Sequence, residues 1–486
     1  MYMKKPILFA TISIAMILKS NAQIDQTLFL RQVSFNTGSS SSSAPHTLCS
    51  GDIDGDGKVD VVVANSGGNT ISIFKNTCTS GHSFDSSSFA TKIDLLVLNA
   101  PLMPTLCDID NDGKVDIAVG HYNSNFISIY PGSSSVGSIV FGNRIDIAAN
   151  ANPSYVIFAD LDGDGKQDMV VSNFGSNNFS VYRNTSTVGN ISFGSALNIN
   201  TGSGPAYLKA LDVNRDGKKD IIITNFNNSS FSVFRNIGSI GFIYFDVIKN
   251  FTVNGGPNGL DLCDINNDSL PDIAISSSTS GQISIFQNTS TSNSVNFVVK
   301  FIQPTGTGAQ ELVFADLDRD GIKDLSIVNN GGNTITVYHI KSGLTTIDSN
   351  FYDTKTTFNT TGGPTSIAAA DMDGNSSNDL IITNSVSGEI TVLVNKYHIS
   401  GAGINEQHSI EENKIIVSPN PFNNNLSVQN IPNENIESVI LYDLCGKLLI
   451  TSKEHIIDTK NLTSGTYFML IKTDKNLYHQ KVIKQD

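Results

Sequence analysis

The sequence predicts an all-β protein, a seven-bladed β-propeller followed by a small β-sandwich domain. Three observations lead to this prediction. A nine-residue acidic segment recurs seven times, each copy lies between short apolar or alternating stretches, and a separate strand-rich segment follows the last copy. The composition agrees, because 40 Gly and only 14 Pro among 486 residues suit short strands joined by turns.

The net charge argues against one large class of function. With 31 Lys and Arg against 45 Asp and Glu, the formal net charge is −14. No surplus of positive charge is available to neutralise phosphates, so we expect no nucleic-acid binding. The only apolar run suited to a membrane lies at the N-terminus, and no internal transmembrane helix is expected.

Residues 1–22 are predicted to be a secretory signal peptide. Lys4 and Lys5 precede an apolar stretch from Ile7 to Leu18, and the small residues before Gln23 suit a signal peptidase. The alternative, a membrane anchor, is disfavoured because about a dozen apolar residues are too few to cross a bilayer. Five cysteines, an odd number, define no disulfide framework.

The acidic segments define a repeat that spans residues 23–397, the predicted propeller. Their first residues are separated by 56, 52, 52, 52, 52 and 55 positions, which unrelated loops would not produce. These first residues are Asp52, Asp108, Asp160, Asp212, Asp264, Asp316 and Asp371.

Each period predicts four strands, the size of a propeller blade. An apolar stretch such as Tyr155 to Ala159 precedes the acidic segment, and a β-branched run such as Ile221 to Ile223 follows it. An alternating strand comes next, as at Phe179 to Tyr182, and a looser fourth strand is expected around Phe193 to Ile199.

The order of strands also predicts that the ring closes. The array opens with a fourth-type strand, Leu28 to Phe35, and ends with a third-type strand, Ile390 to Val394. Pairing the two would complete the last blade and remove an open sheet edge. An open solenoid is the alternative, and it would require caps that the sequence does not contain.

The acidic segments have the chemistry of a calcium loop. Positions 1, 3, 5 and 9 carry oxygen side chains, position 6 is Gly in five of seven copies, and position 7 offers a backbone carbonyl. Hard cations such as Ca²⁺ need six to eight oxygens at one point. An EF-hand is excluded, because position 12 is an apolar strand residue, such as Val63, Val119 or Val171, instead of Glu.

We therefore predict up to seven structural Ca²⁺ ions, with solvated acidic turns as the alternative. The sites that begin at Asp264 and Asp371 should be the weakest, because each lacks one carboxylate and the turn glycine. The predicted ligands, including each seventh-position residue for its carbonyl, are Asp52, Asp54, Asp56, Lys58, Asp60, Asp108, Asp110, Asp112, Lys114, Asp116, Asp160, Asp162, Asp164, Lys166, Asp168, Asp212, Asn214, Asp216, Lys218, Asp220, Asp264, Asn266, Asp268, Leu270, Asp272, Asp316, Asp318, Asp320, Ile322, Asp324, Asp371, Asp373, Asn375, Ser377 and Asp379.

Such loops in β-repeats resemble the FG-GAP or VCBS repeats of integrin-α-like seven-bladed propellers. The resemblance covers residues from about 28 to 397. It implies structural Ca²⁺ in the loops and, as in several members of that family, a role in adhesion or sugar recognition. It does not specify a ligand, because propellers host many activities.

Residues 398–413 are expected to be a linker, and residues 414–486 a small β-sandwich. The segment from Val417 to Phe422 reads VSPNPF, and the chain ends with a basic strand around Lys481 to Lys484. These motifs closely resemble the type A sorting domain of the type IX secretion system of Bacteroidota, although Ser418 stands where an aromatic residue is frequent. The resemblance implies the secretion machinery as a partner and a secreted or surface-attached product. An ordinary adhesive sandwich is the alternative.

No catalytic constellation is recognised in the sequence, so we expect a binding module without enzymatic activity. Motifs for a hydrolase nucleophile, a zinc protease or a phosphate loop are absent from the sequence. A secreted polysaccharide- or protein-degrading enzyme on the same scaffold is the alternative. A purely structural surface module is a third interpretation.

A candidate ligand face lies opposite the acidic loops, in the turn between the second and third strands. Three successive repeats place an aromatic residue there, Tyr122, Phe174 and Phe226. Such an arc could stack on glycans or on a surface protein. The alternative, which we favour here, is that the preceding Asn starts a turn and the aromatic ring packs between blades.

Overall fold

The computed structural model describes residues 24–38, 44–79, 82, 84–246, 248–396, 417–428, 435–442, 448–473 and 477–485. It divides into two compact units, Met1–His398 and Ile399–Asp486. The predicted signal peptide and linker lie outside the described residues.

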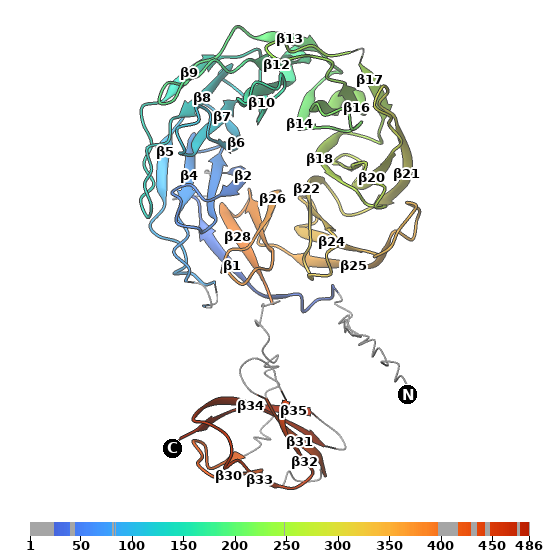
Figure 1. The fold of residues 1–486 in the computed structure, drawn as a ribbon. Coiled ribbons are helices and arrows are strands. Elements are labelled where there is room, and N and C mark those ends of the chain that lie inside the picture. The colour runs from blue at the N-terminus through green and yellow to red at the C-terminus, as the bar shows by residue number, and fades with distance from the viewer. Residues whose placement is uncertain are drawn as a thin grey trace, which may run out of the picture. The chain divides into compact units, whose positions relative to one another are not determined.

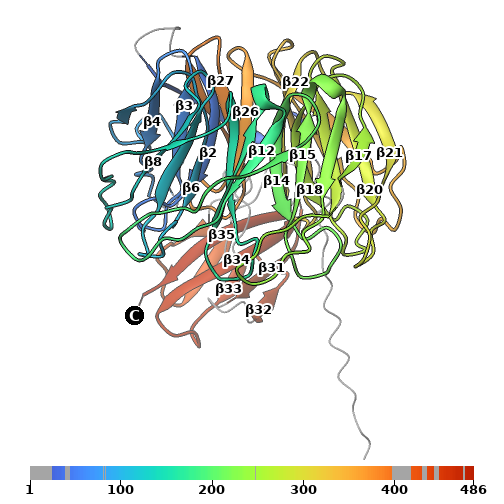
Figure 2. The same cartoon turned by 90° about the horizontal axis from the view of Figure 1, so that it is seen from above.

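The first unit is a ring of seven four-stranded antiparallel sheets (Figure 1 and Figure 2), which confirms the all-β propeller. Blade 1 contains β2 (Pro45–Gly51), β3 (Asp60–Asn65), β4 (Thr70–Phe74) and β5 (Ile93–Leu96). Blade 2 contains β6 (Pro101–Cys107), β7 (Asp116–His121), β8 (Phe126–Tyr130) and β9 (Ile145–Ala148). Blade 3 contains β10 (Pro153–Ala159), β11 (Asp168–Asn173), β12 (Asn178–Tyr182) and β13 (Leu197–Asn200).

The other four blades repeat this arrangement. Blade 4 contains β14 (Pro205–Leu211), β15 (Asp220–Asn225), β16 (Ser230–Phe234) and β17 (Lys249–Thr252). Blade 5 contains β18 (Pro257–Cys263), β19 (Asp272–Ser277), β20 (Gln282–Asn288) and β21 (Phe297–Pro304). Blade 6 contains β22 (Ala309–Ala315), β23 (Asp324–Asn329), β24 (Thr334–Ile340) and β25 (Tyr352–Asn359). Blade 7 contains β26 (Pro364–Ala370), β27 (Asp379–Asn384), β28 (Glu389–Asn395) and β1 (Phe29–Asn36).

Burial on both faces explains why the second strand of each blade is mostly apolar between its first Asp and its last residue. All six residues of β3 are buried, as are those of the equivalent strand in every other blade. Ile71 and Ile73 of blade 1 share one core cluster with Ile117 and Val119 of blade 2. The core therefore lies between neighbouring blades, and the ring is stabilised by the packing of one sheet on the next.

The ring closes as predicted. Strand β1 pairs antiparallel with β28, with Val33 opposite Val392 and Phe35 opposite Ile390. Figure 1 shows β1 on the outer edge of this blade, where the other six blades have their own fourth strand. The N-terminal strand thus supplies the edge that the last repeat lacks.

The predicted bounds of the fourth strand were wrong in one respect. In blade 3 the fourth strand is β13, only four residues long. Phe193, expected within it, instead forms an isolated bridge with Asn184. The reason is that the intervening residues belong to a compact turn in which Asn190 and Thr187 bridge each other.

The second unit contains two small sheets around one core. A three-stranded sheet has the order β29 (Val417–Ser418), β30 (Asn425–Val428) and β33 (Ile456–Asp458). A four-stranded sheet has the order β32 (Leu448–Ser452), β31 (Ile436–Tyr442), β34 (Gly465–Thr473) and β35 (Leu477–Lys484). Leu426 and Ile457 of the first sheet pack in one cluster with Val439 and Met469 of the second. The unit is therefore a sandwich, as its alternating pattern predicted.

Removal of residues 24–36 should open the ring. The edge of β28 would then be free to pair with other molecules, so we expect aggregation and a lower melting temperature. Size-exclusion chromatography and thermal unfolding measure both effects. Truncation after His398 is the matched control, because it removes a separate unit and should leave the ring's melting unchanged. A monomeric, unshifted deletion variant would contradict the prediction.

Candidate metal loops and central pocket

Each acidic loop lies between the first and second strands of a blade and curls around its own carboxylates. In blade 1 the carboxylate of Asp52 accepts hydrogen bonds from the backbone N–H groups of Gly55, Asp56 and Gly57, at 2.8–3.1 Å. The sixth-position N–H donates to the first Asp in all seven loops. The loops therefore share one conformation that gathers oxygens on the inside of the turn.

The ninth-position carboxylate anchors the end of each loop. In blade 1 Asp60 accepts a bond from the N–H of Ile53, at 3.1 Å, and one from the N–H of Asn76, at 2.8 Å. Equivalent pairs of bonds occur in the other six blades. One side chain thus joins the loop to the end of the third strand.

Five blades extend this connection to the preceding blade. The Nδ2 atom of Asn184 in blade 3 donates to the carbonyl of Ile109 in the loop of blade 2, at 2.8 Å. Asn76, Asn236, Asn288 and Asn395 make the equivalent bond in their own blades. The acidic loops therefore lie at the joints between neighbouring sheets.

The sixth position has left-handed backbone geometry throughout. The φ angle is +83° at Gly57 and about the same at four other glycines, but it is +67° at Ser269 and +64° at Ser376. A side chain in this conformation costs about 1–2 kcal/mol. The two loops that the sequence marked as weakest are thus the two with a non-glycine residue in this conformation at the sixth position.

The donor chemistry of the loops fits a hard cation. Carboxylate oxygens of Asp52, Asp54 and Asp60 lie within 4.8 Å of one another, and equivalent groups occur in blades 2, 3 and 6. In blade 6 the ring of His339 joins Asp318 and Asp320 in another such group. Oxygen clusters of this kind are the ligands that Ca²⁺ prefers.

Burial opposes the ionisation of the ninth-position carboxyl groups. Desolvation raises the pKa of Asp60, Asp116 and Asp168 from 3.8 to about 6, against the effect of their backbone hydrogen bonds. Burial raises the pKa of Asp324 and Asp379 further, to about 8. A nearby positive charge would keep these groups ionised at neutral pH.

A pocket of about 230 Å³ lies at the other end of the ring, on its axis. Its walls are the first two residues after the start of the innermost strand in blades 1 to 6 and Thr365 in blade 7, together with Tyr122, Phe174 and Phe226. In blade 3, for example, Ser154 and Tyr155 follow Pro153, which pairs with Asn173 at the end opposite the acidic loop. All seven blades contribute to this pocket.

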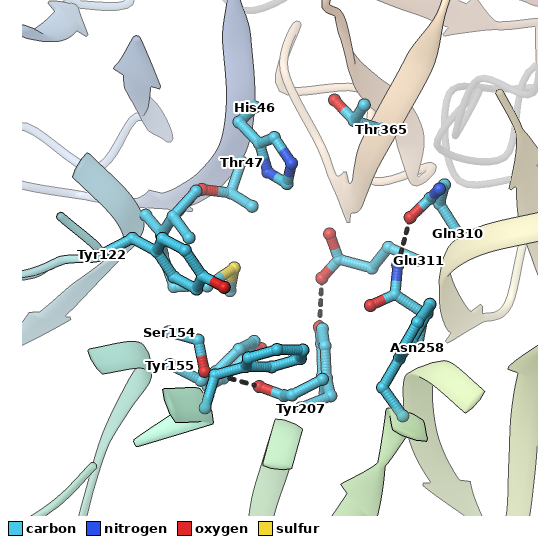
Figure 3. Close-up of a pocket in the computed structure, with 16 residues that line it drawn as sticks. His46, Thr47, Tyr122, Ser154, Tyr155, Tyr207, Asn258, Gln310, Glu311 and Thr365 are labelled. Atoms are coloured by element: carbon cyan, nitrogen blue, oxygen red, sulfur yellow. Dashed lines mark hydrogen bonds between the residues drawn. The ribbon is translucent and has the colours of Figure 1, made fainter. Parts of the chain in front are cut away.

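Glu311 is the one carboxylate in the pocket wall and is almost fully buried. The hydroxyl groups of Tyr207 and Ser366 donate to it, and the N–H of Ile367 lies 3.4 Å from it. Figure 3 shows Glu311 and Tyr207 meeting across the axis. Burial raises the pKa of Glu311, whereas these hydroxyl groups and the charge of Lys209 oppose that rise.

The aromatic arc forms part of the pocket mouth. The ring centroids of Tyr122 and Phe174 are 5.9 Å apart, and those of Phe174 and Phe226 are 6.4 Å apart. All three side chains are half-buried and line the pocket. The three rings thus contact one another between neighbouring blades and also line the pocket, so both the ligand face and packing between blades stay predictions. Each preceding residue does end a strand, and short 3-10 turns follow at Phe174–Ser176 and Phe226–Asn228.

Sequence reasoning missed Glu311, because no local motif marks it. An alignment of the seven repeats on the first residue of the innermost strand would have found it. At its position the other blades carry Thr47, Met103, Tyr155, Tyr207, Gly259 and Ser366. The four cysteines among the described residues are free, and Cys445 lies outside those residues.

The chain matches two kinds of protein family. Residues 108–171, 160–223, 212–275 and 264–327 match the FG-GAP-like repeat, and residues 44–78 match the FG-GAP repeat. Residues 416–485 match the secretion system C-terminal sorting domain.

Individual proteins are similar over parts of the chain or in fold only. A T-cell immunomodulatory protein homolog from Plasmodium yoelii yoelii is 39% identical over 77 residues, which is 14% of this chain and 11% of that protein. The crystal structure of BBS1N in complex with ARL6DN has a TM-score of 0.49 at 12% identity, covering 76% of this chain and 99% of the other. Virginiamycin B lyase from Staphylococcus aureus, in a catalytically inactive form, has a TM-score of 0.47 at 14% identity, covering 75% and 99%.

Within the part of the chain that the structure describes, no helix has the length and apolar character needed to span a bilayer. The sorting domain places the protein in the secretion pathway, as a secreted or cell-surface protein.

Replacing Ser376 by Gly should stabilise the protein by about 1 kcal/mol, because the left-handed backbone no longer opposes a side chain. The reverse change, Gly57→Ser, is the matched control and should destabilise by a similar amount. A Cβ at Gly57 would meet no atom within 4 Å, so crowding does not contribute. Thermal unfolding measures both variants, and equal melting temperatures for all three proteins would refute the argument.

Proposed function

Because this chain is built of FG-GAP repeats and ends in a type IX secretion sorting domain, we propose that it is an exported calcium-binding propeller that acts as a binding or adhesion module. The acidic loops would hold structural Ca²⁺ at the joints between blades. The opposite end of the ring would present the ligand face. The sorting domain would engage the secretion machinery.

The first support is the repeated loop geometry. Each loop directs side-chain oxygens inward, and its ninth carboxylate accepts hydrogen bonds from two backbone N–H groups of its own blade, as Asp60 does from Ile53 and Asn76. Carboxylates this close repel one another unless a cation lies among them. When bound, Ca²⁺ would supply that positive charge, and Asp108, Asp110 and Asp116 of blade 2 exemplify the residues that would hold it.

The observation that carries the binding role is the aromatic arc at the mouth of a buried polar pocket. Tyr122, Phe174 and Phe226 form a continuous half-exposed surface across three blades. Asn258 and Gln310 also line the pocket. The side-chain amide of Asn258 donates a hydrogen bond to that of Gln310. Aromatic faces beside amide and carboxylate groups suit a saccharide ring or a protruding side chain of a surface protein.

A secreted degrading enzyme is the second candidate, and Glu311 is the observation that favours it. A buried carboxyl group with a raised pKa, hydrogen-bonded to Tyr207 in a pocket, is suited to general acid–base chemistry. Burial of the Glu311 carboxyl lowers the stability of the fold, which is more easily explained if the group has a function. Turnover assays separate this candidate from pure binding.

Chelation of calcium should lower the melting temperature, and the drop should grow with pH. The ninth-position carboxyls have pKa values raised to about 6–8 in the folded chain, so without metal the folded state holds more protons than the unfolded state above pH 4. Stability without metal should therefore fall as the pH rises from about 4 to 8. Melting curves with EDTA and with Ca²⁺ at both pH values measure this, and curves that EDTA leaves unchanged at every pH would count against calcium.

Replacing the three arc residues by Ala should weaken ligand binding at least tenfold, since each ring contributes about 1 kcal/mol. A glycan array identifies the ligand, and titration with that glycan measures the affinity. The matched control replaces Phe242 and Tyr244, a stacked pair that is 62% and 54% exposed on blade 4 away from the pocket. Equal loss in both variants would contradict an arc-specific site. Product release that disappears in Glu311→Gln would instead support the enzyme.

A further inference from the structure

The side chain next to each acidic loop comes from one position of the repeat. It falls 23 residues after the first Asp of the loop, immediately beyond or at the end of the third strand. Its occupants, from blade 1 to blade 7, are Lys75, Pro131, Arg183, Arg235, Gln287, His339 and Val394.

In blade 1 the position holds a cation inside the loop. The Nζ atom of Lys75 contacts Asp54 and lies 2.8 Å from Asp56. These are the third and fifth positions of the loop, two of the four that supply side-chain oxygens. The side chain of Lys75 is only 17% exposed, and that of Asp54 is fully buried.

Blade 3 repeats the arrangement with a guanidinium group. Nε of Arg183 lies 2.5 Å from Asp162, and Nη2 lies 2.6 Å from Asp164. The carboxylates at the third and fifth positions of the loop are thus again contacted by nitrogen donors.

Blade 6 uses an imidazole ring. Nε2 of His339 lies 2.9 Å from Asp318, and Nδ1 lies 2.5 Å from Asp353. The ring therefore lies between two carboxylates, and its Nε2 atom is 3.8 Å from Asp320 at the fifth position of the loop.

These cations follow the charge of the loops. Four loops have carboxylates at all of positions 1, 3, 5 and 9, those of blades 1, 2, 3 and 6. In three of these four loops, those of blades 1, 3 and 6, the side chain at this repeat position contacts the loop carboxylates. The loops of blades 4, 5 and 7 have Asn at position 3 or 5 and so carry three carboxylates.

Blade 4 shows that a positive residue at this position does not enter every loop. Arg235 pairs with Asp246, at 2.7 Å, and makes no ion pair with the loop of its own blade among the described residues. In that loop the third position is Asn214, whose amide bonds to Asp216 at 3.0 Å. A loop with fewer carboxylates attracts the cation less.

We propose that Lys75, Arg183 and His339 take the place of the metal in blades 1, 3 and 6 through their side-chain nitrogens, so that Ca²⁺ binds only the loops of blades 2, 4, 5 and 7. A nitrogen that contacts the third-position oxygen, and in blades 1 and 3 the fifth-position oxygen as well, occupies the space that a calcium ion needs at 2.3–2.6 Å from the same oxygens. Two cations in one loop would also repel each other at short range. Three joints of the ring are then held without calcium.

The test is the calcium content of the purified protein at saturation, measured by equilibrium dialysis with elemental analysis. The wild-type protein should bind four ions, because three of its seven loops are closed by side chains. Lys75→Gln and Arg183→Gln should each bind one more ion. Each should also melt lower in EDTA, by about 5 °C, and regain the loss with Ca²⁺.

Two variants serve as controls. Arg235→Gln occupies the equivalent position but leaves its loop untouched, so its calcium content should equal that of the wild type. Lys75→Arg keeps the charge and should also bind no additional ion. Seven ions in the wild type, or no gain in either Gln variant, would overturn the inference. Seven ions would leave the proposed function intact, whereas none in any variant would remove its calcium component as well.

Discussion

The buried ninth-position carboxylate is the constraint on which the rest of the structure depends. Asp60 and its six equivalents each hold the start of the acidic loop and the end of the third strand with one side chain. In five blades the Asn at the end of the third strand, whose N–H bonds to this carboxylate, also donates from its side chain to a backbone carbonyl in the loop of the preceding blade. The Asp thereby joins the loop to its own sheet, and the Asn joins that sheet to the preceding one. Backbone hydrogen bonds offset part of the desolvation of the Asp carboxyl, and a nearby positive charge would offset more.

This constraint separates the two ends of the ring. One end must repeat, because each joint uses the same hydrogen bonds. The other end is free to vary, and there the seven innermost strands present side chains as different as Met103, Gly259 and Glu311. Variation on a rigid frame produces the polar, aromatic pocket. The fold therefore devotes one face to assembly and leaves the other to recognition.

Much of this arrangement could be predicted from the sequence. The spacing of the acidic segments predicted seven blades, because each repeat of constant length forms one structural unit. The surplus strand at the start predicted the β1–β28 pairing. The pocket could not be predicted, because Glu311 and Tyr207 meet only across the axis, 104 residues apart in the chain. Lys75 and Asp54 were likewise separated by 21 residues with no motif between them. Local patterns identify loops, whereas contacts between distant strands require the closed ring.

The pairing of β1 with β28 also couples the completeness of the ring to its export. The sorting domain follows β28 in the chain, so the ribosome makes it only after the last strand of the propeller. A prematurely terminated product lacks both the partner of β1 and the export address. Every molecule that contains the sorting domain consequently also contains β28, the strand that closes the ring with β1. The order of translation therefore limits export to chains that can close the ring.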